Sequence, residues 1–115
     1  MIPQPTSTRI FLACGVTDMR KGFDGLTVLV QDGLRKKSHS GALFAFRGER
    51  GDPIKLLWFD GQGLCLFSKR MDRGRFVWPL TATDAVTLSS AQASMLLEGI
   101  DWRRAERTLA ATLVG

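Results

Sequence analysis

The middle of the chain consists of three apolar runs separated by two short polar segments. The runs lie at about 42–47, 54–60 and 64–71, and each has the length and the aromatic and branched residues typical of a strand. Residues 48–53 (GERGDP) supply the Gly, Asp and Pro that reverse a chain. Residues 60–63 (DGQG) form a shorter segment, which is typical of a hairpin turn. The pattern therefore predicts an antiparallel meander of three strands.

Both faces of this predicted sheet are largely apolar. Side chains alternate across a strand, so Ile54, Leu56 and Trp58 share one face of the middle strand. The opposite face carries Lys55, Leu57 and Phe59. Since apolar surface on both sides has to be covered, we expect a further layer on each face.

The N-terminal part predicts one strand and one helix. Residues 9–14 form a short apolar run ended by Gly15, which indicates a buried strand. Residues 17–20 (TDMR) offer capping side chains for a helix start. The helix is expected over about 20–35, with its apolar side chains at helical spacing: Phe23, Leu26, Val30 and Leu34. A basic loop over 35–41 follows.

The C-terminal part predicts an edge strand at about 84–88 and two helices. Ser89 and Gln92 form a capping-box pattern that opens the first helix, and Gly99 ends it. A last helix is expected over 101–115, and how far it is attached to the domain stays open. Its apolar stripe consists of Trp102, Ala105, Leu109 and Leu113.

These elements predict an α+β fold in one domain, 1–115, with a loose leader at 1–8. We expect a small antiparallel sheet of four to five strands. The 20–35 helix follows the first strand and covers one face. The C-terminal helices pack on the other face or on an edge.

Composition narrows the function classes. The chain has 115 residues, a formal net charge of +5, two cysteines and one histidine. No apolar run approaches the roughly 20 residues that a membrane span needs, and two distant cysteines make no disulfide framework. A cytoplasmic protein without a membrane role is therefore expected. The basic excess lies before residue 76 and favours an acidic partner such as nucleic acid.

Enzyme chemistry finds little support in the sequence. A zinc site or a catalytic triad would have to use His39, which lies in the polar loop. Phosphate-cradling motifs are absent. Several carboxylates could in principle meet at a metal, but each has a structural explanation in a turn, a helix start or beside a basic neighbour: Asp18, Asp24, Asp52, Asp60 and Asp72. We therefore predict no enzyme activity, no cofactor and no metal.

The basic residues of the meander are the stronger signal. In an antiparallel meander the end of the first strand, the start of the second and the end of the third lie at one end of the sheet. That end is the candidate DNA-binding site, with Arg47, Arg50, Lys55, Lys69, Arg70, Arg73 and Arg75. The alternative is a solvated rim whose cations pair with Glu49, Asp52 and Asp72.

Three blocks of the sequence carry a resemblance to a known family. They are residues 17–26 (TDMRKGFDGL), residues 55–61 (KLLWFDG) running into 69–79 (KRMDRGRFVWP), and residues 95–102 (MLLEGIDW). The chain closely resembles the TnpB-type accessory protein of insertion-sequence family sixty-six, which is encoded beside the transposase. This resemblance implies a bacterial mobile-element protein that supports transposition without cutting strands. It supplies no established binding residues.

Two hypotheses follow, and a third stays open. The first is a non-catalytic accessory protein that binds the DNA of the element ends through the basic sheet end. The second is an adaptor that docks on the transposase through Trp102, Ala105, Leu109 and Leu113 without contacting DNA; the same stripe could instead pack on the sheet. A small metal-dependent nuclease would need Asp18 or Asp60. The sequence does not fix the oligomeric state.

Overall fold

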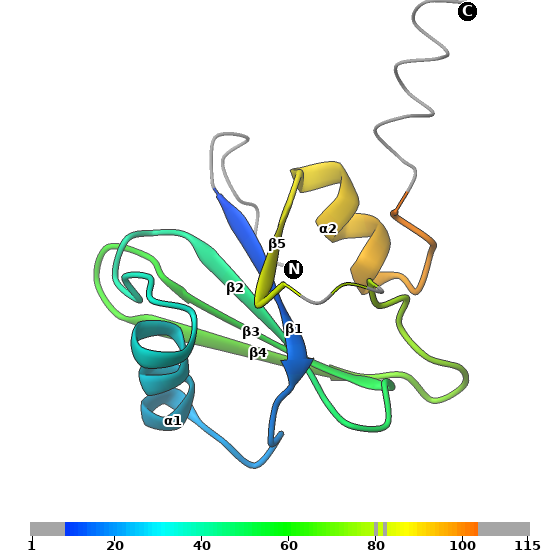
Figure 1. Ribbon diagram of the computed structural model, residues 1–115, viewed down its shortest axis with the longest axis horizontal. Coiled ribbons are helices and arrows are strands. Elements are labelled where there is room, and N and C mark those ends of the chain that lie inside the picture. Colours follow the sequence, from blue (N-terminus) through cyan, green and yellow to red (C-terminus); the bar gives the residue numbers. More distant parts are fainter. Residues whose placement is uncertain (1–8, 80, 82, 104–115) are drawn as a thin grey trace, which may run out of the picture.

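The computed structural model describes residues 9–79, 81 and 83–103, and its centre is a five-stranded sheet (Figure 1). The order across the sheet is β4-β3-β2-β1-β5. The strands are β1 (Ile10–Val16), β2 (Leu43–Arg47), β3 (Pro53–Phe59), β4 (Leu64–Arg70) and β5 (Ala85–Leu88). The meander of three strands and the edge strand near 84–88 are thereby confirmed.

The sheet is mixed, so the prediction of an antiparallel sheet was wrong for one pair. β2–β3, β3–β4 and β1–β5 are antiparallel, but β1 and β2 run parallel, from Ile10 beside Leu43 to Val16 beside Arg47. Parallel neighbours need a crossover of a dozen or more residues, and residues 17–42 with their helix provide one. The parallel pair brings the carboxyl ends of β1 and β2 to the same end of the sheet.

The helix after the first strand is present but shorter than predicted. α1 spans Phe23–Val28 and continues as the π-helical turn η1, Leu29–Gly33. Its N-cap is Gly22, without a side-chain cap, so the expected cap in residues 17–20 was wrong. The carboxylate of Asp18 instead accepts hydrogen bonds from Arg20.

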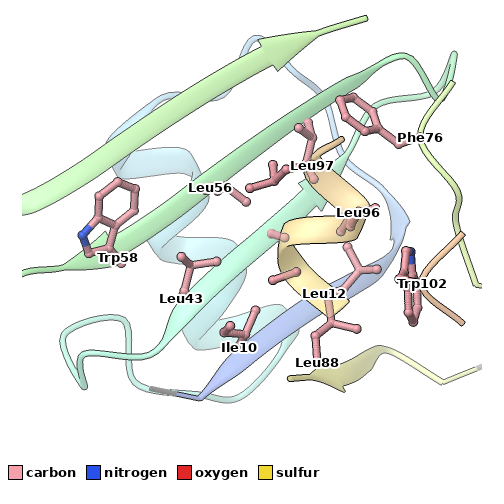
Figure 2. Packing of buried hydrophobic residues seen from close by; sticks show 13 residues of the cluster. Ile10, Leu12, Leu43, Leu56, Trp58, Phe76, Leu88, Leu96, Leu97 and Trp102 are labelled. Atoms are coloured by element: carbon pink, nitrogen blue, oxygen red, sulfur yellow. The ribbon is translucent and has the colours of Figure 1, made fainter. Parts of the chain in front are cut away.

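The two faces of the sheet carry separate cores, as the apolar pattern predicted. Ile54, Leu56 and Trp58 lie in the core on the α2 face, together with α2 residues and Trp102 (Figure 2). Leu57 faces the other side. It packs there with the fully buried Leu26 and Val30 of α1 and η1 and with β2 residues Phe44 and Phe46.

α2 spans Ser90–Leu97 and begins with the predicted capping box: the Ser89 hydroxyl accepts from the Gln92 amide, and the Gln92 side chain accepts from the Ser89 amide. Gly99, at φ +76°, follows its last turn. The expected helix over 101–115 falls largely outside the described residues, as does the leader at 1–8. Asp101 and Trp102 are not helical. Within the described part of the chain, no helix is long and apolar enough to cross a membrane.

Candidate nucleic-acid interface

One end of the sheet collects three loops and most of the basic side chains. Strand register places Arg47 beside Val16 and Ile54, and Arg70 beside Pro53. The carboxyl ends of β1, β2 and β4 therefore meet there, and we call this region the basic end. Its segments 17–22, 47–55 and 69–75 hold nine basic and four acidic residues.

The first two loops of the basic end pack on each other. The Thr17 amide donates to the Arg47 carbonyl at 2.8 Å, and the Thr17 side chain is buried. A Cβ on Gly48 would lie 2.5 Å from Pro53 Cγ and 2.8 Å from Met19 Cγ, so only glycine fits between the loops. The Lys55 ammonium spans the same junction and donates to the Lys21 carbonyl at 2.9 Å. This contact fixes the 17–22 loop against the sheet.

The third loop carries an exposed arginine segment, residues 70–75, between two backbone anchors. The Met71 amide donates to the Asp52 carbonyl at 2.8 Å, and the Phe76 amide donates to the Gly51 carbonyl at 3.0 Å. Phe76 is buried, and the indole of Trp78 donates to the same Gly51 carbonyl at 3.0 Å. Both ends of the arginine segment are therefore fixed to the β2–β3 turn, while residues 72–75 stay exposed.

The seven predicted site residues lie at this end, but four of them are engaged within the protein. Lys69 Nζ donates to the Leu97 carbonyl at 2.6 Å, at the C-terminus of α2. Lys55 bonds Lys21, as described, and Arg50 forms a salt bridge with Asp52 at 3.5 Å. The guanidinium carbon of Arg47 lies 5.1 Å from the centroid of the Trp78 ring. These contacts position the loops.

The remaining three candidates, Arg70, Arg73 and Arg75, are exposed. Across residues 9–79, 81 and 83–103 none of them forms a salt bridge. The rim alternative, with its cations paired to Glu49, Asp52 and Asp72, therefore fits Arg50 but does not describe these arginines.

The structure adds Arg20 and Lys21 to the basic end, which the sequence interpretation did not include. Both are exposed, and the Asp18 carboxylate holds the Arg20 guanidinium through bonds of 2.8 to 3.2 Å. These bonds keep the pKa of Asp18 well below its usual range. The signal that could have found them is the strand–helix–strand order before residue 47, which predicts a parallel pair and hence a shared carboxyl end.

Of the four partner-binding residues that the sequence predicts, only Trp102 lies among the described residues. Trp102 is 4% exposed and donates its indole N–H to the Val77 carbonyl at 2.8 Å, so it belongs to the core and is not free to dock a partner. Ala105, Leu109 and Leu113 lie outside the described residues. In the described part of the chain, no group of three His, Cys, Asp or Glu side chains is placed to hold a metal ion.

The fold and the basic end define a small α+β protein with exposed arginines at one end of its sheet. The chain belongs to the family described as IS66 Orf2 like protein, which it matches over residues 8–107. It is 50% identical to the uncharacterized protein y4hO of Sinorhizobium fredii (strain NBRC 101917 / NGR234) over 115 residues, the full length of both chains. It is also 34% identical to the uncharacterized protein y4jC of the same organism, over 107 residues that cover 93% of this chain and 92% of that protein. No solved structure shows significant similarity. The family connects the chain to insertion sequences and so to transposition.

Proposed function

We propose that the chain is a non-catalytic accessory protein that supports transposition of its insertion sequence by binding DNA through the arginine segment. The observation that carries this proposal is the exposure and the ion pairing of Arg70, Arg73 and Arg75. All three are exposed and without a salt bridge among the described residues, on a segment anchored at both ends.

The geometry favours phosphate contact over base reading. Arginine presents a planar fork of donors that matches a phosphate oxygen pair, and a fixed backbone reduces the entropy lost when those forks engage. Each phosphate neutralised releases counterions, so the affinity falls with salt. Lys21 lies on the neighbouring loop of the same end and extends the positive surface, while Arg20 beside it is paired with Asp18. Such a surface binds duplex DNA with little dependence on sequence.

An accessory role fits the family connection and the described side chains. Strand cutting by a two-metal mechanism needs carboxylates brought together. Asp18 is bound to Arg20, and Asp60 accepts from the backbone amides of Gln62 and Gly63. We therefore assign cutting to the transposase encoded by the same element and place the action of this chain in the bacterial cytoplasm, on the DNA of the element ends.

The test compares two triple variants of the full chain in fluorescence anisotropy with element-end DNA and with random DNA. The first variant replaces Arg70, Arg73 and Arg75 by Ala. The control replaces Arg9, Arg35 and Lys37, which are exposed and lie just before β1 and in the segment leading to β2, outside the three segments of the basic end. We expect the first variant to lose affinity by at least tenfold and the control to lose less than threefold. Equal losses would contradict a localised surface.

Docking on the transposase is a separate proposal for the C-terminal segment. A chain ending at Trp102 removes residues 103–115 and can be tested for co-purification with the transposase. Retained pairing would contradict the adaptor hypothesis and leave the DNA proposal unaffected, since the arginine segment remains.

A further inference from the structure

The two outer strands of the sheet have unpaired sides of very different length. β5 has four residues, Ala85–Leu88. β4 has seven, Leu64–Arg70, and all seven pair with β3 without a shift in register. β4 is the outermost strand in the sheet order, and no other strand of the described chain pairs with it (Figure 1). The β4 edge is therefore the long, regular edge of this protein.

Hydrogen bonds at both ends of the β3–β4 ladder identify the backbone groups on the open side. The Asp60 amide donates to the Gly63 carbonyl, and the Met71 amide donates to the Asp52 carbonyl. Hydrogen-bonded and non-hydrogen-bonded pairs alternate in an antiparallel ladder. Residues 65, 67 and 69 therefore bond β3. The residues that turn their N–H and C=O groups outward are Leu64, Leu66, Ser68 and Arg70.

Two of the usual devices that protect an edge, proline and a bulge, are absent from this one. Natural edge strands are kept from pairing by short length, proline, bulges or inward-pointing charges. β4 has no proline and no bulge, its two charged residues are Lys69 and Arg70 at its C-terminal end, and the ammonium of Lys69 is held by the Leu97 carbonyl. A seven-residue edge without proline or a bulge is a template for another strand.

We propose that the β4 edge binds the β4 edge of a second copy of this chain, antiparallel, about a two-fold axis at Phe67. This register pairs Leu64 with Arg70 of the second copy and Leu66 with Ser68 of the second copy. All four outward residues of each strand then find partners. The two Phe67 side chains meet as a close, non-hydrogen-bonded pair. Sheet and helical layers continue from one copy to the other.

Charge and shape support a second copy as the occupant. The turn before β4 is acidic at Asp60, and the segment after it is basic from Lys69 to Arg75. Antiparallel pairing brings the acidic turn of one copy near the arginine segment of the other, whereas parallel pairing would place the two arginine segments side by side. A hollow of about 240 Å³ beside the edge, lined by Phe67, Lys69, Ser94, Leu97 and Glu98, leaves room for apolar side chains of the second copy.

The first test measures the mass of the full chain in solution by sedimentation equilibrium, for the wild type and two proline variants. Ser68→Pro removes an outward N–H on β4, and Thr87→Pro is the matched change on β5. In the β1–β5 ladder the Cys14 amide donates to the Asp84 carbonyl, and bonded and non-bonded pairs alternate from that point, so the N–H of Thr87 also points away from the sheet. The side chains of Ser68 and Thr87 are both exposed. We expect a dimeric wild type, a dimeric Thr87→Pro variant and a monomeric Ser68→Pro variant, all with the same circular dichroism spectrum.

The second test reads the register by disulfide formation in a background with Cys14 and Cys65 replaced by Ser. Phe67→Cys places two thiols at the axis, within the reach of a disulfide, while Ser68→Cys places them on a longer diagonal. We expect at least tenfold faster cross-linking of the Phe67→Cys chain. A monomeric wild type at high micromolar concentration, a dimer that survives Ser68→Pro, or equal cross-linking rates would overturn the proposal. A monomer whose β4 binds the transposase instead would also overturn it.

Discussion

Arg47 and Trp78 link the sheet to the far end of the arginine segment. The Arg47 guanidinium carbon lies 5.1 Å from the Trp78 ring centroid, while the indole of Trp78 donates to the Gly51 carbonyl. The Phe76 ring packs edge-on against the Trp78 ring, with 5.8 Å between the two ring centroids. The exposed arginines are thus carried by a loop whose exit is held by aromatic packing and a cation–π contact.

Replacing Trp78 by Ala is expected to lower the free energy of unfolding by about 2–4 kcal/mol, because it removes a partly buried ring, a hydrogen bond and a cation–π contact. It is also expected to weaken DNA binding, since residues 72–75 lose one anchor. Urea unfolding and anisotropy measure the two effects. Trp78→Phe keeps a ring and should restore most of the stability; DNA affinity unchanged in a folded Trp78→Ala chain would contradict the anchoring role.

Lys69 is expected to matter for stability more than for DNA binding. Its ammonium bonds the Leu97 carbonyl at the C-terminus of α2, where a positive charge is favourable. Lys69→Met should lower the free energy of unfolding by about 1 kcal/mol and reduce DNA affinity less than threefold. Arg73→Ala should show the reverse pattern. A large loss of DNA affinity in the Lys69→Met variant would show that Lys69 contacts DNA and would contradict its assignment to stability.

Gly48→Ala is expected to destabilise the protein by about 1–3 kcal/mol, as overpacking does in other tight sites. The added Cβ would lie 2.5 Å from Pro53 Cγ and 2.8 Å from Met19 Cγ, which separates the two loops. Gly15→Ala is the control, because nothing lies within 4 Å of its Cβ position. Thermal unfolding of the two variants gives the comparison, and a Gly48→Ala chain as stable as Gly15→Ala would contradict the packing described.

Asp60 is expected to make the stability of the hairpin depend on acid. The backbone amides of Gly63 and Gln62 lower the pKa of its carboxyl, so the ionised form is favoured in the folded state. The stabilisation is present above the unfolded pKa of about 3.9 and is lost as the pH falls below it. The melting temperature of Asp60→Ala should lie below that of the wild type at pH 7, and the difference should shrink on acidification below about pH 4. A difference that stays constant with pH would sink this account.

Much of the fold could be predicted from the sequence because it depends on local pattern. The alternation through Ile54, Leu56 and Trp58 gave the two faces of β3, and Ser89 with Gln92 gave the start of α2. The parallel pairing of β1 and β2 was missed. The meander suggested an antiparallel sheet, whereas the crossover through α1 decided the direction. That error removed Arg20 and Lys21 from the predicted basic end.

The roles of individual cations could not be predicted, because long side chains reach distant backbone. Lys55 bonds a carbonyl 34 residues away, and Lys69 bonds one 28 residues away. No spacing in the sequence distinguishes these lysines from Arg73 or Arg75, which the structure leaves exposed. Only the folded geometry separates positioning residues from candidate contacts.

The salt dependence of DNA binding tests the central proposal most directly. The logarithm of the affinity falls linearly with the logarithm of the salt concentration, and each phosphate that the protein neutralises adds about 0.9 to the magnitude of that slope. The wild type, the Arg70/Arg73/Arg75→Ala chain and the Arg9/Arg35/Lys37→Ala chain carry the comparison. We predict that the slope of the arginine-segment variant is shallower by about 2.7 and that the control keeps the wild-type value. Identical slopes for the wild type and the arginine-segment variant would contradict the assignment of DNA binding to this surface.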